Sequence, residues 1–390
     1  MGQVIANAID YTIERTALRG LATIVLCCGI GFISCQYYFT YPLSAVIVVL
    51  WLTAGSRRLA SAYVASYSIF SSWVVVPAIV DYLDWAPAKA VGLWLIGLCI
   101  VLLPWSLLYR KDGKYAIFRT ALVMACTFVP PLGVVQFASP FVGTSMLIPG
   151  LGVVSMIVGL GLIVLISEGH RSGMYNTAVT TALVFGLATL TGLFSTPKSP
   201  DGWVAVNTGV EVGGLEHTIV GSMEALTIAK KVAYDKRPDV VVLGESTGGY
   251  SVEAGLAVLG RSTEETIVIA GGRDINKQTV IKWEEGVGEI GYRQRLRPVL
   301  LGHMDSAHDG NKTMIIDGLV VAPLICYEGA VPFPMITVMP TKPDVVMGIG
   351  NFYWSRNSEY FGRVFRAHVT AWARIFGTDR IVAVNGGKNV

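Results

Sequence analysis

Hydrophobic and polar positions divide the chain into two halves of different character. Up to about residue 197, long apolar runs follow one another, whereas residues 200–390 mix apolar and polar positions as globular domains do. A helix needs about 20 apolar residues to cross the core of a bilayer. Runs that meet or approach this length cover residues 17–39, 42–54, 59–80, 91–109, 115–137, 146–166 and 175–194. The pattern predicts an α-helical membrane domain over residues 1–199 with about seven spans.

Basic residues gather in alternate connections between these segments. They are Arg15, Arg19, Arg57, Arg58, Arg110, Lys111, Lys114, Arg119 and Arg171, whereas the intervening connections hold Lys89 and little else that is basic. Because basic loops tend to stay in the cytoplasm, the N-terminus is expected inside. Seven crossings then put residue 198 onward outside, which in a bacterium is the periplasmic face of the inner membrane.

The second half begins after the short linker Pro197-Lys198-Ser199-Pro200. Short apolar runs typical of β structure predict strands over 203–208, 239–243, 266–270, 278–283, 314–316, 319–326, 344–349 and 380–384. Helical spacing predicts helices over 215–234 and 357–377, the second with an aromatic stripe on which His368 is expected to be a core residue. Strands alternating with helices indicate an α/β domain over residues 200–390.

Charge and cysteine content narrow the functional classes. The net charge is only +3 over 390 residues, so electrostatics give no support to nucleic-acid binding. Five of the six cysteines lie in the apolar runs, where they behave as small hydrophobic residues. Cys326 is the sixth, and as the lone cysteine of the second half it has no partner there for a disulfide.

Two residues at the ends of expected strands suggest nucleophilic catalysis. Cys326 closes the apolar strand 319–326 and is followed at once by a turn, which would hold its sulfur rigidly. Glu245 follows the apolar run Val241-Val242-Leu243-Gly244, where burial would raise the pKa of a carboxyl and suit it to act as a general base. The alternatives are an inert buried cysteine and a helix N-terminal acid.

A competing motif overlaps the glutamate. The sequence Gly244-Glu245-Ser246-Thr247-Gly248 fits the G-x-S-x-G nucleophile elbow of serine hydrolases, and it lies after a strand as that motif requires. In that fold several strands normally precede the elbow, whereas here only 203–208 does. A serine hydrolase using Ser246 is therefore the weaker alternative.

Taken together, these segments resemble the nitrilase (carbon-nitrogen hydrolase) superfamily. The run 239–247 is similar to its glutamate segment, and Leu324-Ile325-Cys326-Tyr327-Glu328 with Phe333-Pro334 is similar to its cysteine segment, particularly in apolipoprotein N-acyltransferases. The layout of spans ahead of the domain also resembles that family, and most closely the related TraB-type conjugal transfer proteins of plasmids. The resemblance implies an αββα sandwich with Glu245 as base and Cys326 as the acyl-accepting nucleophile, supported by Tyr327 and Glu328.

The family's catalytic lysine is where the sequence departs from the pattern. Arg293 or Gln294 stands at that position, depending on where one missing residue is placed. Arginine would supply charge but is always protonated, and glutamine would supply only a neutral hydrogen bond. Lys282 on the preceding strand is a further alternative, although a surface lysine is the simpler interpretation.

Two functional hypotheses follow from the resemblance. In the first, a membrane-bound amidase or N-acyltransferase passes an acyl group through Cys326 to an amine or water, at the outer face of the membrane. In the second, the domain is a catalytically weakened scaffold for plasmid conjugation at the cell envelope. We expect membrane lipids, and a lipoprotein or other conjugation components, as partners. We expect no cofactor, no metal ion and no nucleic acid.

Overall fold

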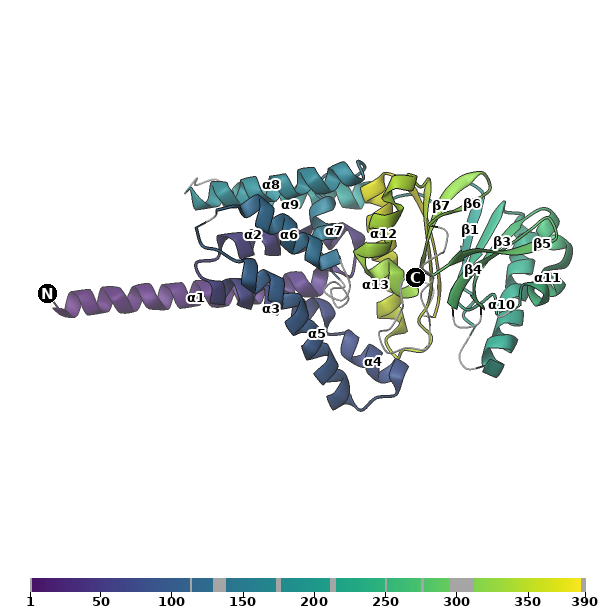
Figure 1. Ribbon diagram of the computed structural model, residues 1–390, viewed down its shortest axis with the longest axis horizontal. Helices are drawn as coiled ribbons and strands as arrows, with labels where there is room; N and C mark the ends of the chain where they lie inside the picture. The colour runs from purple at the N-terminus through teal and green to yellow at the C-terminus, as the bar shows by residue number, and fades with distance from the viewer. Residues whose placement is uncertain are drawn as a thin grey trace.

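The computed structural model describes residues 2–112, 114–128, 138–172, 177–210, 215–249, 251–274, 277–294 and 312–386. Figure 1 shows a helical region at one end, from which the long first helix extends, and an α/β domain at the other. The helical elements are α1 (Gly2–Ser34), η1 (Tyr38–Ala45), α2 (Val46–Thr53), α3 (Arg57–Ser72), α4 (Val75–Leu83), α5 (Pro87–Leu108), α6 (Ala116–Phe128), α7 (Pro140–Ser145), α8 (Val153–Arg171) and α9 (Thr177–Phe194).

Two or three of these elements are candidate membrane spans. In the described part of the chain, α5 and α8 are long and apolar enough to cross a bilayer, and α3 with α4 would form a third span bent by 42°. The other apolar helices are shorter and cover 18–34, 38–53, 116–127 and 179–194. The predicted segment 146–166 is shifted, because Pro149 lies in a turn and α8 starts only at Val153. The helical region is thus confirmed, whereas the count of seven spans stays a prediction.

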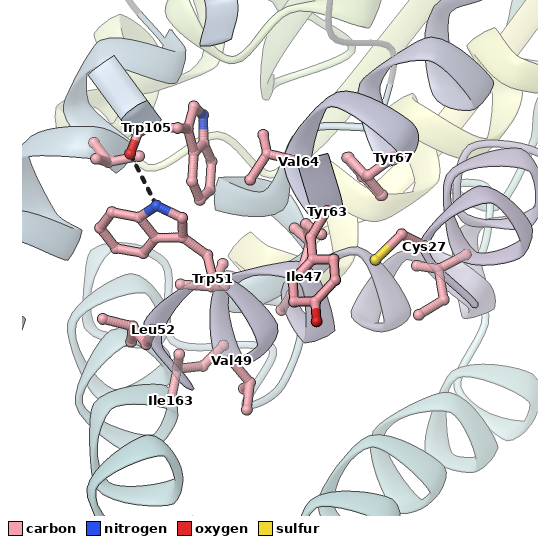
Figure 2. Close-up of a cluster of buried hydrophobic side chains, with 14 of the residues drawn as sticks. Cys27, Ile47, Val49, Trp51, Leu52, Tyr63, Val64, Tyr67, Trp105 and Ile163 are labelled. Carbon is pink, nitrogen blue, oxygen red and sulfur yellow. Dashed lines mark hydrogen bonds between the residues drawn. The ribbon is translucent and has the colours of Figure 1, made fainter. Parts of the chain in front are cut away.

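Large aromatic and aliphatic side chains form the core of the helical region (Figure 2). Trp51 on α2 donates its indole N–H to the carbonyl oxygen of Trp105 on α5, at 2.9 Å, and the two rings meet edge to face. Cys27 on α1 is fully buried in the same cluster, in agreement with its expected role as a small hydrophobic residue. The helices are therefore held by packing and, between α2 and α5, by this hydrogen bond.

In the described part of the α/β domain, nine strands form two sheets. The first sheet has the order β1-β2-β3-β4-β5, and the second has the order β6-β7-β8-β9. The strands are β1 (Trp203–Val206), β2 (Val240–Leu243), β3 (Ile267–Asp274), β4 (Lys277–Glu284), β5 (Val287–Arg293), β6 (Met314–Ile316), β7 (Leu319–Ile325), β8 (Val345–Asn351) and β9 (Asp379–Asn385). The strands β1, β2 and β3 run parallel, as do β7, β8 and β9.

The two sheets lie face to face with helices on both outer sides. Buried side chains from both sheets, such as Val242 and Ile349, share one core cluster between them. Helices α10 (Leu215–Lys236) and α11 (Val252–Leu259) cover the first sheet, and α12 (Pro332–Val338) and α13 (Ser358–Phe376) cover the second (Figure 1). These four layers confirm the predicted αββα sandwich.

Helix α13 also joins the sandwich to the helical region. Trp372 and Phe365 lie in one buried cluster with Leu324 of β7, and Tyr41 of η1 and Val142 of α7 belong to the same cluster. His368 is buried against the Tyr41 ring and its Nδ1 lies 2.7 Å from the Val364 carbonyl oxygen, which confirms its structural role. Helix α13 therefore packs against both the second sheet and the helical region.

Candidate active site

The chain just beyond β2 meets the C-terminal end of β8 in the opposite sheet. Glu245, two residues beyond β2, receives a hydrogen bond from the backbone N–H of Asn351 to its carboxylate Oε2, at 3.1 Å. Its own N–H points to the carbonyl oxygen of Gly350, at 3.4 Å. A methyl group on Gly271 of β3 would lie only 2.6 Å from the Cα of Glu245, so glycine is needed there. The glutamate is thus buried and held from two sides.

Cys326 lies where β7 gives way to a short 3-10 turn. Its backbone has φ of +47°, a region that residues other than glycine rarely adopt. Such strain persists when neighbouring groups enforce it and is common at catalytic sites. The fully buried Glu328 supplies that support, because its Oε2 accepts the N–H of Ile325 at 3.2 Å and the hydroxyl of Tyr292 at 2.9 Å. The side chain of Tyr327 lies outside the described part of the chain.

The side chains of Glu245 and Cys326 are hydrogen-bonded to each other. Burial raises the pKa of Glu245 from 4.5 to about 7. The hydrogen bond with Cys326, the positive charge of Arg273 and the N–H of Asn351 act in the opposite direction and limit this rise. A base with a pKa near neutrality combines a large ionised fraction with a strong affinity for protons. The pair therefore has the geometry and the proton affinity for activating a thiol.

Arg273 is a cationic neighbour that the sequence did not suggest. It lies on β3, two residues beyond Gly271 and so on the same face of the strand. Its charge acts on Glu245, and no lysine is among the charges acting on that carboxylate in the described part of the chain. The signal available in the sequence was a charged residue at the end of an apolar strand. Its significance depends on a pairing between strands that the sequence does not show.

The two candidates for the lysine position point in different directions. Gln294 is buried and donates its side-chain N–H to the carbonyl oxygen of Ile325, immediately before the cysteine, at 3.0 Å. Arg293 precedes it at the end of β5 and is only half-buried. Since successive strand residues face opposite sides, Arg293 faces away from the side that Gln294 and Tyr292 share. Lys282 is held in ion pairs by Glu284 at 2.8 Å and Glu289 at 2.9 Å.

Ser246 is also strained, with φ of +63°, and is 4% exposed. Its carbonyl oxygen accepts a hydrogen bond from the Ser222 hydroxyl at 3.3 Å. A serine hydrolase needs a histidine beside its serine. The described His368 packs against Tyr41 in the helical region and does not serve Ser246. The thiol–carboxylate pair is therefore the better-supported nucleophile and base.

Helix α4 of the helical region reaches this site. Tyr82 interacts electrostatically with Cys326, Glu245 and Arg273, and its ring meets Trp354 edge to face with centroids 5.3 Å apart. One residue earlier, Asp81 accepts hydrogen bonds from the Ser355 hydroxyl at 3.1 Å and from a backbone N–H at 3.0 Å. The approach to the cysteine is thus built jointly by the α/β domain and a helix from the region containing the candidate spans.

A separate hollow of about 180 Å³ lies among α6, α7 and α8. Its lining is mostly apolar and includes Met124, Phe141, Met156 and Leu160. None of the residues around the cysteine contributes to it. The described residues also contain no group of three His, Cys, Asp or Glu side chains placed to hold a metal ion.

Fold and site together define a protein with candidate membrane spans and a cysteine-containing αββα sandwich. In sequence, the chain is similar to two conjugal transfer proteins. It is 24% identical to the probable conjugal transfer protein TraB of Sinorhizobium fredii, over 90% of this chain and 93% of that protein. It is 25% identical to the conjugal transfer protein TraB of Agrobacterium fabrum, over 88% of this chain and 87% of that protein. No protein-family model matches the chain.

Solved structures similar to the chain include a carbon-nitrogen hydrolase and an amidase. A carbon-nitrogen hydrolase from Helicobacter pylori is 14% identical, with a TM-score of 0.35, over 48% of this chain and 74% of that chain. A mutant of the amidase from Nesterenkonia, with acrylamide added at its active-site cysteine, is 11% identical, with a TM-score of 0.33, over 49% of this chain and 75% of that chain. The αββα architecture of the present protein is assigned from its own strand order and layers.

Proposed function

We propose that this TraB-like protein is a cysteine-dependent amidase or N-acyltransferase that serves plasmid conjugation at the outer face of the inner membrane. The observation that carries the proposal is the hydrogen bond between the carboxylate of Glu245 and the thiol of Cys326, in a buried site. A chain that had lost catalysis would have no chemical need for a strained cysteine beside a carboxyl with a pKa of about 7.

The geometry supports a two-step acyl transfer. Glu245 takes the proton of the Cys326 thiol, and the thiolate sulfur attacks the carbonyl carbon of an amide or ester. The glutamic acid then protonates the departing amine or alcohol, which leaves an acyl thioester on the cysteine. An incoming amine or water, deprotonated by the same carboxylate, attacks the thioester and restores the free thiol.

The positive charge that the family's lysine would provide is proposed to come from Arg273. Its charge already stabilises the ionised form of Glu245. An arginine can stabilise developing negative charge but cannot exchange protons near neutral pH. The carboxylate must then carry out all proton transfers itself, which agrees with its raised pKa. Of the two lysine-position candidates, Gln294 supports the cysteine turn and Arg293 has no role in this scheme.

The proposed topology places the helical unit, residues 1–199, in the membrane and the α/β unit, residues 200–390, in the periplasm. Helix α8 starts beside α13, where the Gly152 N–H bonds the Ile375 carbonyl oxygen at 2.8 Å, and ends at Arg171. Its 19 residues span about 28 Å, close to the thickness of a bilayer core. At that far end, the guanidinium of Arg171 donates a hydrogen bond to the carbonyl oxygen of Leu52, at 2.5 Å. A basic end opposite the sandwich supports placing that end in the cytoplasm and the α/β unit outside. The proposal of an inside N-terminus and about seven crossings requires the same orientation.

The substrate is proposed to be a lipid or amine that approaches along the membrane surface. Tyr82 brings helix α4, part of a candidate span, to the cysteine. Membrane lipids, and a lipoprotein or other conjugation components, are the proposed partners. Nucleic acid is not expected to bind.

The test combines trapping with plasmid transfer. Membranes containing the full-length protein are incubated with a phospholipid or an activated ester, and a thioester adduct is sought on Cys326 by mass spectrometry. We expect the adduct in the native protein, its loss in Cys326→Ala, and loss of transfer in both Cys326→Ala and Glu245→Gln at normal membrane levels. Normal transfer with both variants would favour a catalytically weakened scaffold. An effect confined to Ser246→Ala would favour the serine hydrolase.

A further inference from the structure

A second group of charged side chains lies away from the cysteine, where α9 leaves the helical region and joins the α/β domain. Arg374 is in the last turn of α13 and Arg380 is on β9. Arg374 lies against the last turn of α9, where a methyl group added to Gly192 would be 2.9 Å from its Nη1. Arg380 reaches the linker after α9, because its Nε donates a hydrogen bond to the Pro197 carbonyl oxygen at 3.3 Å. Two guanidinium groups thus lie along the end of α9 and the linker that follows it.

Arg374 is buried without a partner for its charged end. The residue is 5% exposed, and neither Nη1 nor Nη2 has a hydrogen-bond partner among the described residues. Burial lowers the pKa of both Arg374 and Arg380, and the phenol of Tyr38 is the one group acting on both in the opposite direction. No carboxylate of the described residues forms an ion pair with either arginine. An unpaired buried charge is strongly unfavourable, so the arrangement fits an anion.

Hydroxyl groups complete the polar surroundings. The Tyr38 hydroxyl and the Thr196 hydroxyl are within 2.5 Å of each other, on the exposed side of the linker. Arg366 on α13 adds a further positive charge that acts on Arg380. Guanidinium groups with neighbouring hydroxyls are the groups that bind phosphate oxygens in proteins. The chemistry of the site is therefore that of a phosphate monoester or diester.

The surroundings show which kind of phosphate would be near. Immediately before the linker, Phe194 is 87% exposed and Leu193 is 46% exposed, at the end of an apolar helix. Tyr37 on the other side is 44% exposed. Exposed aromatic and aliphatic side chains next to basic residues are typical of the boundary between bilayer core and headgroups. The two arginines therefore lie next to an exposed apolar surface of the kind that faces the headgroup boundary of a bilayer.

We propose that Arg374 and Arg380, together with Tyr38 and Thr196, bind the phosphate group of a membrane phospholipid at the junction of the helical region and the α/β domain. This site is distinct from the cysteine site. Phe365, whose ring lies against the cysteine turn at Gly329, precedes Arg374 by nine residues, which is about 13 Å along α13. The bound headgroup would fasten the α/β domain to the membrane surface independently of catalysis.

The experiment measures phospholipid binding to the purified full-length protein in detergent micelles. Native mass spectrometry with phosphatidylglycerol gives the affinity of the native protein and of Arg374→Gln and Arg380→Gln. We expect each variant to bind at least about tenfold more weakly, since each loses a charge-assisted hydrogen bond to phosphate. The matched control is Arg261→Gln, an exposed arginine at the opposite side of the sandwich, which should bind as the native protein does.

Two further probes separate the possible sources of binding. Diacylglycerol offers the same chains without phosphate, and inorganic phosphate offers the anion without chains; neither should match phosphatidylglycerol. Equal binding of inorganic phosphate would reduce the site to one for free anions and overturn the proposal, as would equal binding of diacylglycerol. Undiminished lipid binding in both arginine variants would overturn it as well.

Thermal unfolding distinguishes a variant that has lost lipid binding from one that is only less stable. Without added lipid, Arg374→Met should be at least as stable as the native protein, because it removes an unpaired buried charge. Added phosphatidylglycerol should then raise the melting temperature of the native protein and not that of the variant. A variant that is destabilised without lipid, yet still stabilised by it, would show that Arg374 is structural and refute the proposal. The conservative Arg374→Lys should retain part of the lipid response.

Discussion

Replacing Glu245 by glutamine should make the protein more stable in alkaline solution while removing the proposed catalytic base. Burial raises the pKa of this carboxyl from 4.5 to about 7. The folded protein therefore holds the proton more tightly than the unfolded chain does. Stability from this group is fully present below pH 4.5 and is lost as the pH rises from 4.5 through 7.

The magnitude follows from the pKa. Each pKa unit corresponds to about 1.4 kcal/mol, so ionising Glu245 costs about 3 kcal/mol more in the folded than in the unfolded state. Glutamine keeps an oxygen that can accept the Asn351 N–H and carries no charge at any pH. The stability advantage of Glu245→Gln should therefore grow by about 2–3 kcal/mol between pH 5 and pH 8. For a chain of 390 residues that corresponds to a relative rise in melting temperature of roughly 2–4 °C.

The assay is thermal unfolding in detergent at both pH values, with tryptophan fluorescence as the readout and the exposed Glu264→Gln as control. The control should show no pH-dependent difference from the native protein. In the same preparations, alkylation of the Cys326 thiol by iodoacetamide at pH 7 should be slower in Glu245→Gln by about 10²-fold or more. A melting-temperature difference that is identical at pH 5 and pH 8 would refute the raised pKa, and unchanged alkylation would refute the role as base.

Three further predictions concern neighbouring side chains. Gln294→Ala should lower the free energy of unfolding by about 1–3 kcal/mol, because the buried carbonyl oxygen of Ile325 loses its hydrogen-bond donor. Arg293→Ala should leave the free energy of unfolding nearly unchanged. Unfolding in denaturant measures both variants. Arg273→Gln should move the midpoint of the thiol alkylation–pH profile upward, because the charge that lowers the pKa of Glu245 is removed; a midpoint that stays in place or moves down would contradict this. Asp81→Asn should weaken the docking of α4 and speed amide exchange in that helix, as hydrogen-exchange mass spectrometry can show, and unaltered exchange would argue that ring packing alone holds the helix.

Much of the α/β fold could be predicted because its strands bury one or both faces. The runs that became β2, β7 and β8 are almost uniformly apolar, and the aromatic spacing of α13 is strongly helical. Strand β5 was missed because only one of its seven positions is buried and it contains two glycines, so neither periodicity nor composition marked it. Helices α11 and α12 were missed because each spans only seven or eight residues.

The candidate site was predictable in part for a related reason. Glu245 and Cys326 stand at the ends of apolar strands, where polar residues are conspicuous. Arg273 and Tyr82 could not be assigned, because their nearness to the cysteine arises from strand pairing and from the docking of α4, both non-local in sequence. The sequence alone could not decide whether Arg293 or Gln294 supports the cysteine turn, because that depends on the side of β5 to which each side chain points.

Helix α13 has a practical consequence for work on this protein. From Phe361 to Ile375 nearly every side chain is buried, some against the second sheet and others against η1 and α7. A truncated protein beginning at residue 200 would expose to water the apolar side chains of α13 that η1 and α7 normally cover. Exposed apolar surfaces of this kind promote aggregation. Attempts to study the α/β half in isolation should therefore yield insoluble material, unless the flanking helices or a detergent shield that surface.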